Sequence, residues 1–592
     1  MEEPNDADLY DAQDEDTYPI HGLTLRKLDE IEVASDLVVS VLDAMAIVLG
    51  LLWAIEVTTA LSDASGGALK VLWGFDGTYD AVPSPSDSTW LLHVLELVEW
   101  KVLRTVLSTA AHVPRIYYRY FEVPKAGNVN RTIFDGSAAK VHWAKPGRMG
   151  LPTMAVIIEV LSMLPHATYV CADIRNWFHV IPLPEGVKHL FSCTVKEDPQ
   201  DRIFELNTTP MGTPHAPRHA QICGWILILS SAPQGLHPDL SGCQNDPPPF
   251  VWFLNSKGER VAVAFLWLDN VTIACRNAVN ARSFAHNLRQ MQKGADPKTS
   301  CGITWKELSC SEICDFLGLR IWWEGHGSEA IMKWRHKLSN IDRWKLLIKT
   351  RPFHTVRDLQ MRLGVITWDT CARVHPFAVV RDVLDCSPLN TIRPESTPHA
   401  LNTAQIELIQ RQLVFVCENE VAERRVYRLP KTSIFAFSDA TLKRAGFFLT
   451  DSRGNIVGTP ASAPATGGDI YEEEAEEAML AIEAGWHHAD HVVLGCDNLN
   501  TVYAFQRKNA RRDTVCARIL RLDAMRSHGK TFCIAYVPTD ENPADGLTRW
   551  NKAEKWKGKD YKGVGYAVET HKLLSALSIV MAYAPPTKTR GR

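Results

Sequence analysis

Two acidic residues lie at the ends of strand-like apolar runs, where a carboxylate is costly unless it is compensated. The run from Val263 to Cys275 is interrupted at Asp269 and Asn270, and its content of Val, Phe, Ile and Thr predicts two buried strands joined by a tight turn. Asp and Asn both tolerate turn backbone angles, so this stretch alone favours a purely structural hairpin.

A second acid, about ninety residues earlier, makes a functional role for Asp269 more plausible than a purely structural one. Asp173 ends the short apolar run Tyr169–Ala172, so its side chain can emerge at the end of a strand and converge with Asp269. Magnesium prefers oxygen ligands, and two such ions can clamp the attacking and leaving oxygens of a phosphoryl transfer. The pair of acids therefore suggests nucleotidyl transfer.

Four motifs in order resemble the palm of a reverse transcriptase. They are Asp173 followed by Phe178, then Pro210-Met211-Gly212, then Trp267-Leu268-Asp269-Asn270, then Phe316-Leu317-Gly318. The order is specific, although each motif alone is weak. One departure concerns the chemistry: the family carries a tyrosine and a second acid where this chain has Trp267 and Asn270.

The resemblance implies roles for residues around the palm. Phe121–Lys125 and Arg131–Asp135 alternate like the strands of a hairpin, and by resemblance Lys125 and Arg131 hold the incoming triphosphate. Phe178 would exclude a ribose 2′-hydroxyl, while Met211 and Gly212 would support the nascent base pair. Lys306 is a candidate match to a palm lysine. The structural alternatives are a solvated basic hairpin, a packed ring and an ordinary turn.

Strand-then-acid patterns recur after Thr432. Asp439 and Asp497 end two apolar runs, Asp545 follows a third, and Glu474 lies in an acid-rich helix expected over Ile470–Ala484. These four residues resemble, in order, the metal ligands of ribonuclease H. Glu473 is the fallback for Glu474, and acids at a helix amino terminus also suit its dipole.

The two resemblances together imply an α+β and α/β multidomain fold, a right-hand polymerase (fingers, palm, thumb) followed by a ribonuclease H-like domain. The expected division is a disordered acidic tail (1–22), a helical N-terminal region (23–113), fingers and palm (114–330), thumb and connection (331–430), the ribonuclease H-like domain (431–550) and a basic C-terminal tail (551–592). Lys333 to about Asp385 is expected to be helical and basic.

The implied activity is that of an RNA-directed DNA polymerase, a nucleotidyltransferase, coupled to ribonuclease H, an endonuclease and hydrolase that cleaves RNA in RNA–DNA hybrids. Its cofactor would be Mg²⁺ in two-metal sites, with Mn²⁺ as a substitute, held by Asp173 and Asp269 and by Asp439, Glu474, Asp497 and Asp545. Its partners would be an RNA template, a DNA primer, hybrids and dNTPs. Two alternatives stay open: a ribonuclease H whose polymerase is deficient because of Asn270, and a domesticated, non-catalytic nucleic-acid-binding scaffold.

Composition agrees with a globular nucleic-acid enzyme once the amino terminus is set aside. The net charge is −4, but residues 1–18 hold eight acids and no Lys or Arg, which leaves 60 acids against 64 bases. The acidic start is unlike a signal peptide, and the apolar stretch Leu37–Ile55 is broken by Asp43, which favours a buried helix. We expect reduced cysteines and an intracellular protein, in the cytoplasm or nucleus, without a membrane segment.

No Asp-Ser-Gly or Asp-Thr-Gly protease signature and no His/Cys zinc module of an integrase accompanies these motifs. The motifs cover about residues 115–550. Together with the closing segment Tyr536–Arg549, this organisation is most similar to retrotransposons of the tyrosine-recombinase (DIRS-like) class, with trypanosomatid VIPER elements as a closer candidate.

Overall fold

The computed structural model describes most of residues 116–548 and short segments ahead of them. Those segments are 18–20, 23–25, 27–28, 95, 97–99 and 101–106; the ranges left out within 116–548 are 125–128, 137–145, 148, 184, 196–197, 241–242, 244–246, 296–301, 351–352, 385–396, 426–432, 452–454, 509, 511, 526–529 and 540–541. Several predictions therefore lie outside the described residues, namely Lys125, the Leu37–Ile55 helix, the first seventeen residues and the basic C-terminal tail.

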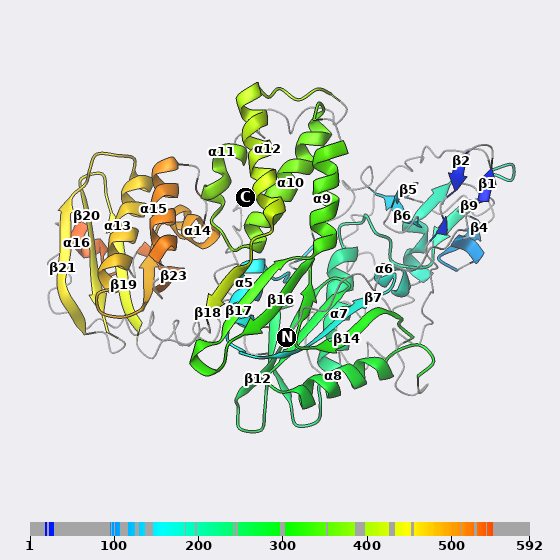
Figure 1. The fold of residues 1–592 in the computed structure, drawn as a ribbon, viewed down its shortest axis with the longest axis horizontal. Coiled ribbons are helices and arrows are strands. Elements are labelled where there is room, and N and C mark those ends of the chain that lie inside the picture. The colour runs from blue at the N-terminus through cyan, green and yellow to red at the C-terminus, as the bar shows by residue number, and fades with distance from the viewer. Residues whose placement is uncertain are drawn as a thin grey trace. The chain divides into compact units, whose positions relative to one another are not determined.

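The chain divides into two compact units. The first comprises Met1–Leu151, Val170–Ile273 and Asn277–Cys310, and the second comprises Pro152–Tyr169, Ala274–Arg276 and Ser311–Arg592. The fold is mixed, with several sheets and helices in each unit (Figure 1). Neither unit contains a described helix long and apolar enough to cross a membrane.

The first unit is built on a six-stranded sheet in the order β10-β11-β12-β13-β7-β14. Its strands are β7 (Thr168–Ile174), β10 (His237–Asp239), β11 (Phe250–Leu254), β12 (Arg260–Trp267), β13 (Asn270–Cys275) and β14 (Trp305–Ser311). The helices of this unit are α6 (Trp177–Val180), η5 (Glu185–Leu190), α7 (Ala216–Ser230) and α8 (Ala278–Gln290). The expected hairpin around Asp269 is confirmed as β12 and β13.

Smaller sheets complete the first unit. They comprise β1 (Tyr18–Ile20), β2 (Leu23–Leu25), β3 (Lys27–Leu28), β4 (Leu103–Val106), β5 (Arg119–Pro124), β6 (Val129–Asp135), β8 (Ser192–Thr194) and β9 (Ile203–Leu206). The hairpin predicted before Asp135 is confirmed, because β5 and β6 pair antiparallel with Val123 opposite Arg131.

The structure differs at two places from what was expected for residues 1–113. β1 pairs with β2, so Tyr18–Ile20 form a strand where a disordered tail was expected. In the region expected to be helical, residues 95 and 97–99 are helical, whereas β4 pairs with β9 from Leu103 opposite Leu206 to Val106 opposite Ile203. The partner of β4 lies far along the chain, and such pairing overrides a local helical pattern.

The second unit contains a four-stranded sheet and a helical group. These comprise α5 (Met154–Leu161), β15 (Cys314–Phe316), β16 (Leu319–Glu324), η6 (Gly327–Glu329), β17 (Ile331–His336), α9 (Leu338–Thr350), α10 (Val356–Ala372), η7 (Phe377–Val380), α11 (Arg381–Leu384), α12 (Thr403–Glu418) and β18 (Ala422–Arg425). The helix expected from Lys333 begins instead at Leu338. Lys333 and Arg335 lie on β17 because they pair across the sheet with Trp322 and Arg320.

A five-stranded sheet in the order β21-β20-β19-β22-β23 forms the rest of the second unit. Its elements are β19 (Ser433–Ala440), β20 (Arg444–Thr450), β21 (Ile456–Pro464), α13 (Ile470–Gly485), β22 (His491–Cys496), α14 (Leu499–Arg507), α15 (Asp513–Ala524), β23 (Thr531–Tyr536) and α16 (Asp545–Thr548). β19 runs antiparallel to β20 and parallel to β22. The strand and helix types predicted here are confirmed.

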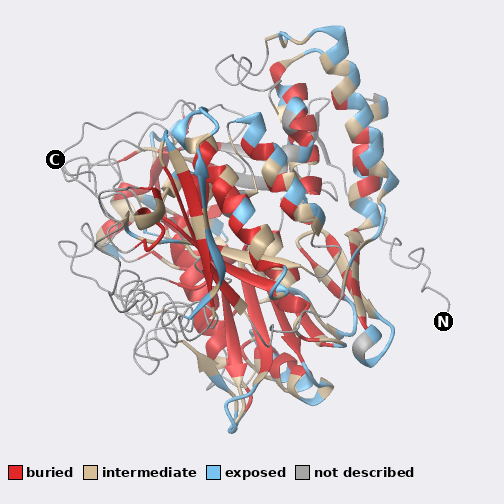
Figure 2. Cartoon of the chain, turned by 90° about the vertical axis from the view of Figure 1, so that its left-hand side faces the viewer, coloured by how far each residue is buried: buried red, intermediate tan, exposed pale blue. Residues whose placement is uncertain are grey.

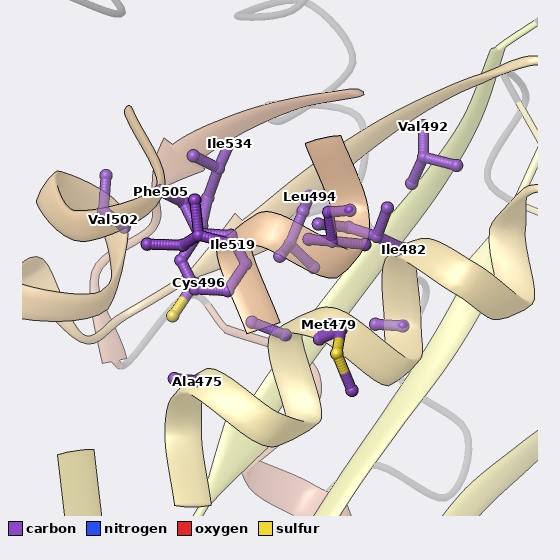
Figure 3. Close-up of a cluster of buried hydrophobic side chains, with 14 of the residues drawn as sticks. Ala475, Met479, Ile482, Val492, Leu494, Cys496, Val502, Phe505, Ile519 and Ile534 are labelled. Atoms are coloured by element: carbon purple, nitrogen blue, oxygen red, sulfur yellow. The ribbon is translucent and has the colours of Figure 1, made fainter. Parts of the chain in front are cut away.

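Alternation along β19 buries both faces of this sheet. Ile434 and Ala436 join Met479 and Ile482 of α13 in one apolar cluster, part of which is drawn in Figure 3. Phe435 and Phe437 belong to a second cluster with Ala544, next to α16. Figure 2 shows many strands of the chain coloured as buried, and helices along which buried and exposed residues alternate. Large apolar side chains contribute roughly 1.5–3 kcal/mol each when fully buried. Packing of β19 side chains on both faces of the sheet therefore holds this strand, and Asp439 near its end, in place.

Candidate active sites

The first acidic site, defined as Asp173, Asp269 and Asn270, lies on neighbouring strands of the six-stranded sheet. β7 and β13 are adjacent, and the Ile174 backbone N–H donates to the Asp269 carbonyl at 3.0 Å. The Asn270 amide nitrogen donates to Asp269 Oδ1 at 3.0 Å. All three side chains are half-buried. The structure therefore brings together the two acids that the sequence singled out.

A lysine occupies part of this site. Lys306 Nζ lies 3.4 Å from Asp173 Oδ2, and its side chain is 57% exposed. Lys306 was a candidate palm lysine from the sequence, and the structure places it directly on an acid of the site. One carboxylate thus faces an ammonium group and the other accepts from an amide, so both acids already have favourable partners.

Gln221 of α7 makes hydrogen bonds to the backbone of the β12–β13 hairpin, a role that the sequence motifs did not indicate. Its Oε1 accepts from the Leu268 backbone N–H at 2.8 Å, and its Nε2 donates to the Leu266 carbonyl at 2.9 Å. Leu268 itself has a positive φ of 56°, which a branched side chain adopts only when its surroundings impose it. The signal in the sequence was a polar residue within the apolar run Ala220–Leu229.

Close packing of α7 against β12 supports these hydrogen bonds. A Cβ added at Gly224 would lie 2.8 Å from Leu266 Cδ2, so the glycine allows the helix to approach β12. Gln221 is fully buried and lies one helical turn before Gly224, on the same side of α7. The position of Asp269 therefore depends on a helix that contains no acid.

The structure also describes the local surroundings of other residues to which the resemblance assigned roles. Gly212 has a φ of 112°, and a Cβ added there would lie 2.3 Å from the Phe134 carbonyl oxygen of β6, so this position requires a glycine. Met211 and Phe178 are half-buried, and Arg131 lies on β6. Their roles toward a nucleotide stay predictions.

The second acidic site, defined as Asp439, Glu474, Asp497 and Asp545, begins at one edge of the five-stranded sheet. Parallel β19 and β22 pair in a register that places Ser438 opposite Cys496. The residues that follow, Asp439 and Asp497, therefore leave neighbouring strands side by side.

Electrostatics shows that Glu474 of α13 faces the same edge. Burial, together with repulsion from Asp439 and Asp497, raises the pKa of Glu474 to about 9. Glu474 is 4% exposed and Asp439 is 2% exposed. The fold therefore holds these carboxylates near one another in a low-dielectric setting, where Asp439 and Asp497 disfavour ionisation of Glu474.

Glu473, the alternative ligand, points elsewhere. Thr466 Oγ1 donates to Glu473 Oε1, and the Gly468 backbone N–H donates to the same oxygen at 3.0 Å. Burial alone would raise the pKa of Glu473, but these hydrogen bonds outweigh it and the pKa is lowered. Of the two neighbours, Glu474 is the one placed to bind a cation with Asp439 and Asp497.

Asp545 begins α16, and Thr548 of the same helix contacts the second acidic site through a hydroxyl whose role the sequence did not indicate. Asp545 is 3% exposed at the start of α16. Thr548 Oγ1, one turn later, donates to Asp439 Oδ2. Asn542 Nδ2 donates to the Ser438 carbonyl at 2.9 Å, so α16 and the loop before it are attached to the end of β19.

The donor set fits divalent cations. One ligand atom each from Glu474, Cys496 and Asp497 lies within 4.8 Å of the other two. Asp497 Oδ1 is buried and receives no hydrogen bond from any residue that the structure describes. A buried carboxylate oxygen without a donor is costly, and a cation bound there would offset that cost.

Comparison with known proteins found no matching family model and no matching curated protein. Among solved structures, the chain is similar to a foamy viral protease-reverse transcriptase in complex with RNA/DNA hybrid, with 13% identity, a TM-score of 0.42, and coverage of 79% of this chain but 56% of that one. The dRH form of the same viral protein in complex with ds DNA has 12% identity and a TM-score of 0.42, and the match covers 86% of this chain and 83% of that one. A third structure, of the viral protein with dsDNA, has 12% identity and a TM-score of 0.39, and the match covers 78% of this chain and 85% of that one. These similarities are low, so we infer function from the chain's own residues.

Proposed function

We propose that the chain is a reverse transcriptase joined to a ribonuclease H, and that its second acidic site hydrolyses the RNA strand of RNA–DNA hybrids. The observation that carries the proposal is the convergence of Asp439, Glu474 and Asp497 on one buried edge, where burial, together with repulsion from the two aspartates, raises the pKa of Glu474 to about 9. Strongly perturbed carboxylates gathered in this way are typical of catalytic and metal sites.

Magnesium, when bound, would supply an activated water and stabilise the leaving 3′-oxygen. The residues that would hold it are Asp439, Glu474, Asp497 and Asp545. The chain's own contribution is orientation: Thr548 fixes Asp439 through a hydrogen bond, and α13 holds Glu474 away from solvent. The backbone of β19 and β22 sets the spacing of the first and third acids.

The test is cleavage of an RNA–DNA hybrid in Mg²⁺. Wild-type protein should cleave the RNA strand, and Asp497→Asn should abolish that cleavage, because it removes the charge of a carboxylate at the centre of the site. Glu473→Gln is the matched control, since its carboxylate is bound by Thr466 and Gly468. An intact hybrid with wild-type protein would instead favour a non-catalytic scaffold.

For the first acidic site the proposal is RNA-directed DNA synthesis with Asp173 and Asp269 as the metal ligands. Asn270 would offer a carbonyl oxygen without charge. The incoming dNTP would contact Lys125 and Arg131, with Phe178 excluding the 2′-hydroxyl and Met211 and Gly212 beneath the base pair. The source we propose is a retrotransposon of the tyrosine-recombinase class.

A second candidate is a ribonuclease H whose polymerase site has lost activity. It is favoured by the partners that the acids of the first site already have, since Lys306 contacts Asp173 and Asn270 donates to Asp269. Primer extension by the wild type and by Asn270→Asp separates the two candidates. If extension is unchanged by Asp269→Ala, the proposed location of the polymerase site is wrong.

A further inference from the structure

A buried thiol lies among the acids of the second site. Cys496 is the last residue of β22 and is 0% exposed. Its Sγ lies 3.9 Å from Glu474 Oε2, and it immediately precedes Asp497. Figure 3 shows Cys496 with the apolar cluster between β22 and α13. The thiol therefore has an apolar side and a side that faces carboxylates.

The spacing suits one ion bound by a sulfur and two carboxylates. The ligand atoms of Glu474, Cys496 and Asp497 all lie within 4.8 Å of one another. Zinc binds sulfur at about 2.3 Å and carboxylate oxygen at about 2.0–2.2 Å in tetrahedral sites, which puts two ligand atoms roughly 3.5 Å apart. The 3.9 Å separation between Cys496 and Glu474 thus needs only a small closure.

A second observation is independent of the thiol. Asp497 Oδ1 is buried, and within the described part of the chain nothing donates a hydrogen bond to it. Magnesium chemistry does not use the sulfur, because Mg²⁺ selects oxygen ligands whereas soft thiolates select ions such as zinc. The thiol therefore adds an ion selectivity that hydrolysis with magnesium does not require.

We propose that Glu474, Cys496 and Asp497 form a binding site for one thiophilic divalent ion of the zinc and cadmium class, and that this ion inhibits the site by displacing magnesium. On binding, the thiol proton passes to solvent and the sulfur forms a bond to the ion; no electrons are transferred. Inhibition rests on the proposed ribonuclease H function, whereas binding does not.

The first experiment measures binding to the full chain with Cd²⁺ alone as the probe, after chelator treatment and under a non-thiol reductant. The readout is the ultraviolet thiolate-to-cadmium charge-transfer band. We expect Cys496→Ser and Cys496→Ala to lose this band, because each substitution removes the sulfur from which it arises. The Cd²⁺ concentration for half-saturation, measured for these variants by equilibrium dialysis, should rise at least about tenfold, since even outer-shell changes cost that much affinity. The matched control is Cys516→Ser, whose buried thiol donates to the Ala510 carbonyl at 3.3 Å.

A band that persists unchanged in both Cys496 variants would overturn the site, as would equal losses in Cys496→Ala and Cys516→Ser. Circular dichroism checks that each variant is folded. Cadmium NMR of the wild type decides the matter without any substitution, because one sulfur ligand gives a shift different from that of an all-oxygen site.

The second experiment measures inhibition. Hybrid cleavage in Mg²⁺ is titrated with Cd²⁺, and each variant is scaled to its own rate without Cd²⁺. Wild type and Cys516→Ser should be inhibited at about tenfold lower Cd²⁺ than Cys496→Ala, in line with the loss of a ligand. If none of the proteins cleaves hybrid but the band depends on Cys496, the ribonuclease H proposal fails and the thiophilic site stands. If cleavage is present and inhibition ignores Cys496, the inhibitory role is overturned.

Discussion

The two acidic sites differ in how their carboxylates are compensated. At the first site, Asp173 has the Lys306 ammonium group 3.4 Å away and Asp269 accepts from Asn270. At the second, Glu474 is almost fully buried beside Asp439 and Asp497, and its pKa is raised to about 9. The first site therefore has favourable partners without a metal ion, whereas the second is held together by packing against repulsion that a cation would relieve.

The largest expected effect tests this contrast at Glu474. Glu474→Gln replaces a carboxylate whose ionisation is opposed by burial and by the neighbouring acids with a neutral amide, so it should abolish hybrid cleavage while stabilising the metal-free protein. A metal ion supplies several kcal/mol of transition-state stabilisation, and loss of about 4 kcal/mol corresponds to roughly a thousandfold lower rate. Cleavage assays and thermal unfolding in chelator measure the two effects.

Glu473→Gln is the control for that experiment. Its carboxylate accepts from Thr466 and Gly468, so the substitution should keep cleavage within a few-fold and lower stability by about 1 kcal/mol through lost hydrogen bonds. If Glu473→Gln is inactive and Glu474→Gln is active, the two neighbours have been assigned the wrong way round.

The pH dependence of metal-free stability is the next expected effect. The folded-state pKa of Glu474 is about 9 and its ordinary value is 4.5, so the folded chain binds more protons than the unfolded chain between these values. Stability then falls as pH rises from about 4.5 towards 9. Glu477, whose pKa burial and the nearby Glu476 and Glu473 raise to about 7, adds to the fall in the lower part of that window.

Denaturant unfolding in chelator across this pH range measures the slope. Glu474→Gln should flatten it above the range of Glu477, and saturating Mg²⁺ should also flatten it by favouring the ionised carboxylate. A stability that rises steadily from pH 5 to 9 in the metal-free wild type would contradict the repulsion inferred at the second site, because its sign is opposite.

Local sequence patterns were sufficient to predict where the acids of the second site lie along their strands, but not which residues contact them. Strand-end positions for Asp439 and Asp497 followed from apolar runs, and parallel pairing of β19 with β22 then placed them side by side. The resemblance favoured Glu474 over Glu473, and the structure adds that Glu473 is bound by Thr466 and Gly468 whereas Glu474 is near Asp439 and Asp497. Thr548 and Gln221 were missed because they act on groups 109 and 47 residues away, where sequence spacing carries no signal.

The strands β4 and β17 were not predicted, for a related reason. β4 has a sequence that alternates too briefly to distinguish it from the helical pattern around it, and only its pairing with β9 defines it. Likewise Lys333 and Arg335 are followed by a helical pattern, but pairing with β16 makes them part of β17. The core strands around Asp173 and Asp269 were predicted because their continuous apolar runs reflect burial itself.

A smaller effect is expected at Asn270, where the first site can be made more like the second. Asn270→Asp adds a carboxylate beside Asp269, so it should raise primer extension by about tenfold through tighter metal binding, the lower end of the range for changes around a metal. The control is Asn270→Ala, which removes the oxygen ligand as well as the amide that donates to Asp269 and should not raise extension. Extension that falls in Asn270→Asp would show that the site depends on reduced charge.

The smallest effect is expected at Lys306, which distinguishes a compensating partner from a structural one. Lys306→Met should change the free energy of unfolding by no more than about 0.5 kcal/mol, because a half-exposed ion pair contributes little. The same substitution removes a cation that competes for Asp173, so the Mg²⁺ concentration for half-maximal primer extension should fall by up to about fivefold, the equivalent of a surface ion pair worth up to about 1 kcal/mol. Lys257→Met, at an exposed turn of the same unit, controls for the change in net charge. If both variants shift the Mg²⁺ concentration for half-maximal extension equally, Lys306 acts only through long-range charge. If Lys306→Met raises that concentration, the lysine assists the reaction rather than occupying the place of a metal ion.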